Sequence, residues 1–281
     1  MDTFVGALRP GCFMAGLDIK DCFFHWSIHS SSRRKLGIRH PITGQRGVYL
    51  FLPPGLSSAP GHNEEYVGVV VLAASRGLDI TVARFVDDLR IVNSKKLDPL
   101  DDEKVLNLHL ECLKHNLEEL GVKVHTKTGK YIAATQSIEW LGWRIDSVSL
   151  RVWLTPAKYA KGLQLCQQLL DAHFKGERIT AKQVMSTAGF LNFLSTVLKQ
   201  SRPYLRSLYQ CLARGQVFAA WQRGERRHDP EVKLSDQAAE DLSWWCVALL
   251  RPMYRALHVV GDTVSIWHQK HPDLSALRQL A

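Results

Sequence analysis

The stretch Phe85-Val86-Asp87-Asp88 places two adjacent carboxylates between apolar segments of the chain. Residues 80–86 and 89–92 are rich in β-branched side chains, so we expect two strands with the acidic pair at the tip of their hairpin. Adjacent carboxylates repel each other, and apolar surroundings raise the cost of ionising both. A bound cation would relieve this repulsion. The alternative interpretation is a solvated turn, because Asp is a common turn residue.

The composition is that of a globular protein with one large or two modest domains. The 281 residues are 46% hydrophobic and 22% charged, and no apolar run approaches the roughly 20 residues of a membrane helix. The first residues lack a secretory signal, so a cytoplasmic or nuclear location is expected, with no membrane partner. The six cysteines include no Cys-x-x-Cys pair, which argues against a zinc site or a disulfide framework.

Positive charge is concentrated in one region. The net charge is +9, and residues 151–227 contain 13 Lys or Arg against three acids, which accounts for the whole surplus. A surplus of this kind favours a polyanionic partner such as nucleic acid. The alternative is a solvated helical surface.

A third carboxylate, Asp18, lies in the apolar segment 12–28, which we expect to be a strand interrupted by acids. A buried strand rarely tolerates a lone carboxylate, so Asp18 needs a hydrogen-bond donor or a metal ion as its partner. Its other possible role is the N-cap of a short turn.

The segment 49–60 contains Pro53-Pro54-Gly55 followed by Ser-Ser-Ala-Pro. This order predicts an extended chain, a sharp turn and then a helix that runs to about Arg76. Gly55 would let a ligand approach the backbone closely. Taken alone, the motif is a turn before a helix.

The rest of the chain divides into an α/β part and a helical part. We expect short strands on either side of the connection 41–47, a helix over 98–120, a strand over 122–125 and a strand pair over 137–146. Helices are expected over 156–173, 180–198, 202–214 and 235–250, and a strand begins near 257–262. The expected domains are 1–150, 151–228 and 229–281.

Adjacent antiparallel strands could bring Asp18, Asp87 and Asp88 together. Oxygen ligands of this kind suit Mg²⁺, which binds few carboxylates and leaves positions for water and substrate phosphates. Two such ions would activate an attacking hydroxyl and stabilise a leaving pyrophosphate. The three carboxylates therefore indicate nucleotidyl transfer.

Several motifs, in this order and spacing, resemble the palm and thumb of a retroelement reverse transcriptase over residues 13–250. Leu17-Asp18-Ile19-Lys20-Asp21-Cys22-Phe23-Phe24 resembles the first catalytic motif, and residues 52–60 resemble the Leu-Pro-x-Gly-Leu-x-x-x-Pro motif. Phe85-Val86-Asp87-Asp88 is similar to the Tyr-x-Asp-Asp box, with Phe in place of the usual Tyr. Trp140-Leu141-Gly142-Trp143 is similar to the primer grip. The combination of residues 140–147 with Asp241-Leu242-Ser243-Trp244-Trp245 looks most like DIRS-type tyrosine-recombinase retrotransposons.

The resemblance implies a role for each matching residue. The metal ligands would be Asp18, the Ile19 carbonyl and Asp87, with Asp88 nearby; two Mg²⁺ ions are expected, and Mn²⁺ could replace them. Lys130 would protonate pyrophosphate, and Lys127 is the other candidate for this role. Either lysine could instead be a solvated surface residue. Phe23 would be the steric gate that excludes a ribose 2′-hydroxyl. Asp21, Cys22, Phe23 and Gly55 would bind the nucleotide; Lys158, Lys161, Lys182, Lys199, Arg202 and Arg206 are the expected nucleic-acid contacts.

The expected fold is α+β: a palm of antiparallel strands backed by helices, partial fingers and a helical thumb. Seventeen residues precede Asp18, too few for full fingers, and residues 229–281 resemble a connection or the start of a ribonuclease H domain. The expected function is RNA-directed DNA synthesis from a primer 3′-hydroxyl, with an RNA or DNA template and deoxynucleoside triphosphates as partners; protein partners are left open. The alternatives are an inactive remnant that only binds nucleic acid, an RNA-dependent RNA polymerase and a scaffold without metal.

Overall fold

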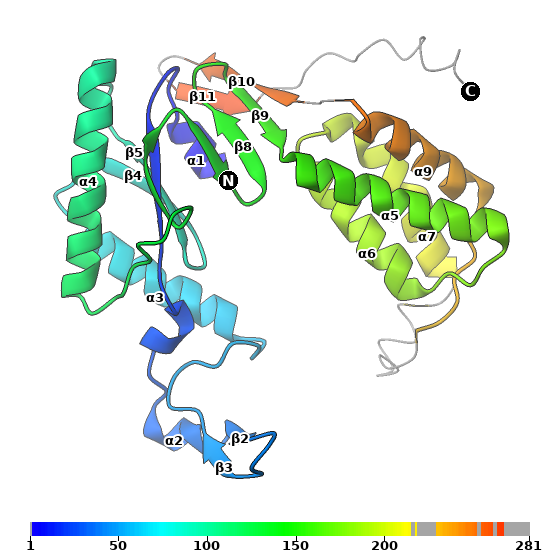
Figure 1. Ribbon diagram of the computed structural model, residues 1–281, viewed down its shortest axis with the longest axis horizontal. Helices are drawn as coiled ribbons and strands as arrows, with labels where there is room; N and C mark the ends of the chain where they lie inside the picture. Colours follow the sequence, from blue (N-terminus) through cyan, green and yellow to red (C-terminus); the bar gives the residue numbers. More distant parts are fainter. Residues whose placement is uncertain (1, 215–216, 218–228, 252–253, 261–262, 267–281) are drawn as a thin grey trace. The chain divides into compact units, whose positions relative to one another are not determined.

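The computed structural model describes residues 2–214, 217, 229–251, 254–260 and 263–266 (Figure 1). The chain forms two compact units. The first contains most of residues 1–138 and the second most of residues 150–258, together with 139–145.

The first unit is built on a four-stranded antiparallel sheet with the order β4-β5-β1-β6. In this sheet β1 (Met14–Asp18) lies between β5 (Asp88–Asn93) and β6 (Tyr131–Thr135), and β4 (Ile80–Phe85) forms the edge. Asp18 pairs with Asp88, and Asp88 also pairs with Phe85. The register therefore brings the end of β1 to the β4–β5 turn.

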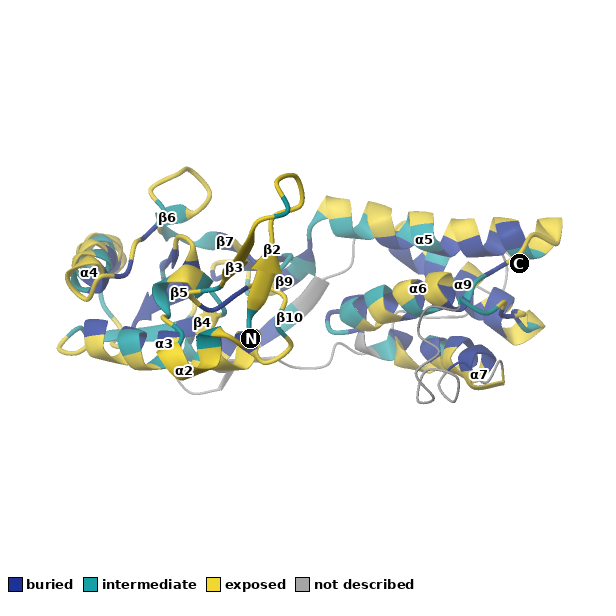
Figure 2. Ribbon diagram, turned by 90° about the horizontal axis from the view of Figure 1, so that it is seen from below, coloured by how far each residue is buried: buried dark blue, intermediate teal, exposed yellow. Residues whose placement is uncertain are grey.

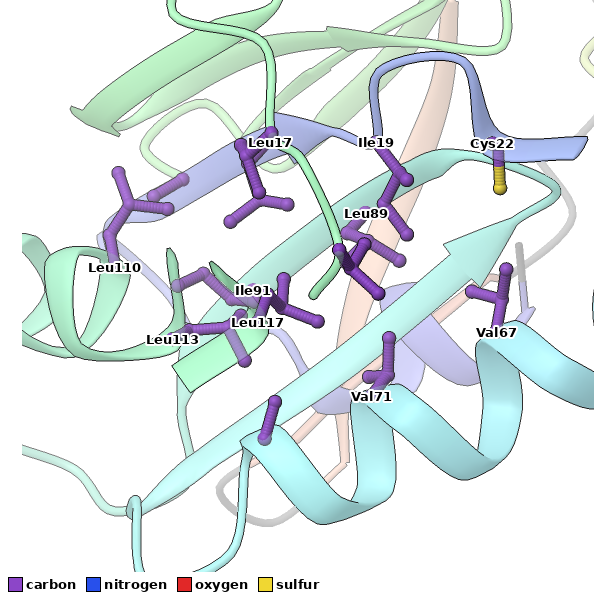
Figure 3. Close-up of a cluster of buried hydrophobic side chains, with 14 of the residues drawn as sticks. Leu17, Ile19, Cys22, Val67, Val71, Leu89, Ile91, Leu110, Leu113 and Leu117 are labelled. Carbon is purple, nitrogen blue, oxygen red and sulfur yellow. The ribbon is translucent and has the colours of Figure 1, made fainter. Parts of the chain in front are cut away.

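One face of this sheet packs against helices α3 (Ala59–Ala74) and α4 (Pro99–Glu119), as Figure 3 shows. Side chains alternate along a strand, so Leu17, Leu89 and Ile91 face this core and are completely buried. The residues between them, Gly16, Asp18, Asp88 and Arg90, must lie on the opposite face. The helices contribute Val67, Val71, Leu106, Leu110, Leu113 and Leu117 to the core.

Local sequence signals explain where α4 begins and ends. The Asp98 side chain accepts a hydrogen bond from the Leu100 amide, and Pro99 occupies the first turn, where no N–H is needed. Gly121 follows the last turn with a φ of 81°.

The remaining elements of this unit are short. They are α1 (Asp2–Ala7), the 3₁₀ helix η1 (Cys22–His25), α2 (Ser30–Arg33), β2 (Gly37–Arg39) and β3 (Arg46–Val48). The β2–β3 pair is an isolated hairpin in which every residue of both strands is exposed (Figure 2).

A second sheet has the strand order β11-β10-β9-β8-β7. These strands are β7 (Ser137–Trp140), β8 (Trp143–Asp146), β9 (Arg151–Leu154), β10 (Tyr254–Val260) and β11 (Thr263–Ile266). The second unit contains β9, most of β8 and β10, and a helical bundle in which α5 packs on α6 and α9. Its elements are α5 (Pro156–Lys175), α6 (Ala181–Leu194), η2 (Lys199–Leu205), α7 (Arg206–Arg214) and α9 (Asp236–Leu249).

The structure corrects four expectations. The strand expected over 12–28 ends at Asp18. The 3₁₀ helix that follows is preceded by Asp21, so Asp18 is not its N-cap. Residues 122–125 form one isolated bridge, between Val124 and Ile19, rather than a strand. Asp88 begins β5, so only Val86 and Asp87 make the hairpin turn.

The fourth correction concerns two helices of the second unit. The helix expected over 180–198 ends at Leu194, where the Ser195 hydroxyl bonds back to the Leu191 carbonyl. The helix expected over 202–214 begins as the 3₁₀ turn η2, because Pro203 has no N–H to donate. The end of the last expected strand, 261–262, lies outside the described residues.

The mixture of helices with antiparallel sheet confirms the α+β class. Within the described residues, no helix combines the length and apolar character that crossing a bilayer requires.

Candidate active site

The site is built where β1 ends beside the β4–β5 turn. Asp18 is the last residue of β1 and is 4% exposed. The amide of the next residue, Ile19, donates a hydrogen bond of 2.8 Å to the Asp87 carbonyl. This bond holds the turn against the end of β1, so two acidic residues about seventy positions apart meet.

The charges of these acids disfavour each other. Burial raises the pKa of Asp87, and the neighbouring Asp18 carboxylate raises it further. The ionised form of Asp87 is therefore destabilised unless a positive charge compensates it. Carboxylates arranged in this way favour a bound cation.

Lys130 provides one such charge. Its ammonium group donates a hydrogen bond to the Asp18 carboxylate, and this bond raises the pKa of Lys130. His125 also lies close, with Nε2 at 3.7 Å from the other Asp18 oxygen. The sequence analysis selected Lys130 through a resemblance and missed His125, for which the sequence gives no signal.

Asp88 has a different environment from Asp87. It forms an ion pair with Arg90, two positions further along the same face of β5. Burial raises the pKa of Asp88, and Arg90 opposes this shift. Gly16 makes room for the arginine, because a Cβ there would lie 2.7 Å from Arg90 Nη1. The sequence analysis missed Arg90, although an arginine inside an apolar strand is a signal for a buried ion pair.

The turn itself is strained. Val86 has a φ of 59°, a left-handed conformation that costs a β-branched residue about 1–3 kcal/mol. Two residues of α3, Asn63 and Glu64, hydrogen-bond to its backbone. Both were missed in the sequence, where the only signal is an asparagine on the buried side of a helical segment.

The residues predicted to bind a nucleotide lie in different environments. Asp21 is exposed, with a φ of 52°, and Phe23 is half-buried in η1. Cys22 is buried; its thiol donates to Asn63 Oδ1, and burial raises its pKa to about 11. Its side chain thus faces the protein interior. Gly55 has a φ of 94° and open space around its Cβ position, which suits a close backbone approach.

The donor set can be tested against a divalent metal. Among the described residues, no group of three or more His, Cys, Asp or Glu side chains could hold a metal ion. Two carboxylates, Asp18 and Asp87, and the Ile19 carbonyl remain as oxygen donors. Mg²⁺ typically binds one or two carboxylates and takes its other ligands from water and substrate phosphates, so this set fits a site that the substrate completes.

The hairpin between β7 and β8 belongs to the second unit. Trp140 and Trp143 are buried, while Leu141 and Gly142 form the turn with φ values of 53° and 80°. A Cβ on Gly142 would lie 2.7 Å from the Lys158 side chain. The turn therefore packs closely against the start of α5.

Four of the basic residues predicted to bind nucleic acid are exposed on the helices: Lys161, Lys182, Arg202 and Arg206. Lys158 is half-buried, and the side chain of Lys199 lies outside the described residues. Lys158 and Lys161 lie over the rings of Phe193 and Phe190, with Nζ to ring-centre distances of 5.6 and 4.9 Å. The bundle thus presents cations and aromatic rings side by side, a combination suited to nucleic acid.

Comparison with known proteins gives two results. Residues 4–145, just over half of the chain, match the family model described as "Reverse transcriptase (RNA-dependent DNA polymerase)". No curated protein matches the chain significantly.

Solved structures of the foamy viral protease–reverse transcriptase share the fold. The form in complex with an RNA/DNA hybrid has a TM-score of 0.58 and 17% identity, covering 89% of this chain and 29% of that chain. The dRH form in complex with double-stranded DNA has a TM-score of 0.57 and 19% identity, with coverages of 88% and 36%. A second double-stranded DNA complex has a TM-score of 0.55 and 16% identity, with coverages of 96% and 46%. This chain thus spans less than half of each of these proteins.

Proposed function

Because the chain belongs to the reverse transcriptase (RNA-dependent DNA polymerase) family, we propose that it extends a primer 3′-hydroxyl with deoxynucleoside triphosphates on a nucleic-acid template. The observation that carries this proposal is the meeting of Asp18, Asp87 and Lys130 at the end of β1. Its two acids match the metal ligands that the family resemblance implies, and its lysine matches the implied proton donor.

In the proposed reaction, the primer 3′-hydroxyl loses its proton to water, and its oxygen forms a bond to the α-phosphorus as the bond from that phosphorus to pyrophosphate breaks. Asp18, Asp87 and the Ile19 carbonyl would hold two Mg²⁺ ions, with Mn²⁺ as a substitute. When bound, these ions supply Lewis-acid stabilisation of the attacking and leaving oxygens. Lys130 gives its proton to the leaving pyrophosphate, while Lys127 has no comparable contact with Asp18.

Other residues are assigned to substrate binding. Phe23 sits in the segment that follows Asp18 and is proposed to exclude a ribose 2′-hydroxyl by steric conflict. Gly55 lets the nascent base pair approach the backbone. The hairpin turn Leu141-Gly142 is proposed to position the primer end. Asp88 is proposed to lie beside the metal site, where its ion pair with Arg90 holds it in place.

The helical bundle is proposed to bind the template–primer duplex through phosphates. Its exposed lysines and arginines supply charge without base readout, so binding should depend on salt and little on sequence. The foamy viral complexes contain double-stranded DNA or an RNA/DNA hybrid, and a duplex ligand for this chain is inferred by analogy. A DIRS-type retrotransposon origin, the domain limits 1–150, 151–228 and 229–281, and a cytoplasmic or nuclear location belong to the same proposal.

A primer-extension assay tests the proposal. The chain is given a DNA primer on an RNA template with Mg²⁺, and either deoxy- or ribonucleoside triphosphates. Extension with deoxynucleotides supports the proposal, and extension with ribonucleotides alone would identify an RNA-dependent RNA polymerase. Salt-sensitive duplex binding without extension would identify an inactive remnant, and no binding of duplex or metal would identify a scaffold.

A further inference from the structure

Both backbone polar groups of Val86 are held by two consecutive residues of α3. The Val86 amide donates to Glu64 Oε2 at 3.2 Å, and the Val86 carbonyl accepts from Asn63 Nδ2 at 3.3 Å. Val86 is the strained residue that precedes Asp87. Peptide groups in such a turn have no strand partner, so side chains from α3 satisfy them instead.

Asn63 also binds the segment that follows Asp18. Its Oδ1 accepts from Trp26 Nε1 at 2.7 Å and from Cys22 Sγ at 3.2 Å. Asn63 has no exposed surface, so one fully buried amide joins the 22–26 segment to the β4–β5 turn. Leaving either side of this amide unpaired would cost the full desolvation of a buried polar group.

Glu64 is itself held in orientation. Its Oε1 forms an ion pair with Arg84 at 3.3 Å, which leaves Oε2 free to accept from Val86. The Arg84 guanidinium lies against Gly68, where a Cβ would approach Arg84 Nη1 to 2.8 Å. The helix therefore provides the space that the arginine needs to align Glu64.

We infer that Asn63 and Glu64 are positioning residues: together they hold the Val86 turn so that Asp87 faces Asp18, and Asn63 also ties this turn to the segment carrying Phe23. The inference rests on the proposed function. It assigns the two residues different effects, because Glu64 contacts the turn and Arg84 of β4, whereas Asn63 contacts both the turn and Cys22, the neighbour of Phe23.

The test measures the rate of primer extension per folded molecule with the purified full-length chain, and two further quantities. One is the Mg²⁺ concentration that gives half-maximal rate, and the other is the preference for deoxy- over ribonucleotides. Glu64→Leu should lower the rate about 10- to 100-fold, as expected when a reacting group moves by about 1 Å, and raise the Mg²⁺ requirement with the sugar preference unchanged. Asn63→Leu should shift both quantities. Glu64→Gln keeps an acceptor for the Val86 amide and should recover most of the rate.

Two matched controls separate positioning from general stability. Glu65→Leu removes the same charge from the next, exposed position of α3. Asn116→Leu removes an amide that donates to the Ala74 carbonyl, at the other end of α3, at 2.7 Å. Both should leave the Mg²⁺ requirement and the sugar preference at wild-type values.

Three outcomes would overturn the inference. The first is a wild-type Mg²⁺ requirement in the Glu64→Leu variant. Because Glu64 lies at the surface, this result can be obtained even if Asn63→Leu does not fold. The second is an equal shift in the two controls. The third is a wild type that extends no primer, which would refute the proposed function as well; an active wild type with unaffected variants refutes the positioning role alone.

Discussion

The Lys130 ammonium group donates a hydrogen bond to the Asp18 carboxylate, although 112 positions separate the two residues in the chain. The lysine approaches from the loop before β6, and about half of its side chain surface is exposed. A lysine at this place can neutralise part of the acidic site and can still reach a substrate that enters from solvent.

Replacing Lys130 by Met should therefore lower the extension rate by about 10²- to 10⁴-fold, the usual contribution of a general acid. Lys127→Met is the matched control, because Lys127 is an exposed lysine three positions earlier in the same loop. Single-turnover primer extension measures both. Equal losses in the two variants, or none in Lys130→Met, would contradict the assignment.

The Asp88–Arg90 ion pair predicts a stability effect. The Arg90 side chain is 6% exposed and that of Asp88 is 24% exposed, so Arg90→Leu leaves a largely buried carboxylate without its partner. Such a loss typically costs about 3 kcal/mol of unfolding free energy. The double variant Asp88→Leu/Arg90→Leu should recover much of it. Urea unfolding at pH 7 measures the difference, and a single variant as stable as wild type would show that the pair contributes little.

The steric-gate assignment of Phe23 predicts altered sugar selection. Phe23→Ala should lower the preference for deoxy- over ribonucleotides roughly tenfold or more, because the gate acts by excluding one oxygen atom. Phe24→Ala changes the adjacent aromatic residue, which is 48% exposed, and should keep the preference. Competition between the two nucleotide types in one extension reaction gives the ratio directly. An unchanged ratio in Phe23→Ala would refute the role.

Duplex binding by the helical bundle should weaken when its cations are removed. Lys158→Gln/Lys161→Gln is expected to reduce the slope of log affinity against log salt by about 0.9 for each lost phosphate contact. Lys104→Gln, on the exposed side of α4, is the control. Fluorescence anisotropy over a range of salt concentrations measures the slope. A slope that does not change would mean that the two lysines contribute only to the helical surface.

Local signals predicted most of the fold. Asp98 and Pro99 marked the start of α4, and Thr180 with Gln183 forms the capping box that starts α6. These features depend on residues within one turn of each other, so the sequence contains them. The strand expected over 122–125 was wrong, because alternation alone does not reveal that the segment meets only the end of β1.

The site was predicted only in part. Asp18 and Asp87 stood out because carboxylates in apolar strands need a partner, and the structure brings them together. Asn63 and His125 were missed, since their roles depend on contacts between distant segments, whereas the local Asp88–Arg90 pair was missed although its signal lies within one strand. Asn63, for example, meets Val86 across 23 positions and Cys22 across 41. No pattern within a single element reports such contacts.

The variant Asp87→Asn removes one proposed metal ligand and should be well folded. The pKa of Asp87 is raised in the folded chain by burial and by Asp18, so its ionised form destabilises the fold above that pKa. The neutral amide should therefore raise the melting temperature at pH 7 in metal-free buffer. This gain should shrink as the pH falls through the raised pKa of Asp87 and vanish below the ordinary pKa of an Asp carboxyl, about 4.

Mg²⁺-dependent primer extension by wild type and by this variant tests the central claim most directly. The account predicts that the wild type extends a DNA primer on an RNA template when Mg²⁺ is present and stops when it is chelated. Folded Asp87→Asn should bind the duplex as tightly as wild type and extend no primer at a measurable rate. Extension by Asp87→Asn at the wild-type rate, or by wild type without a divalent metal, would contradict the account.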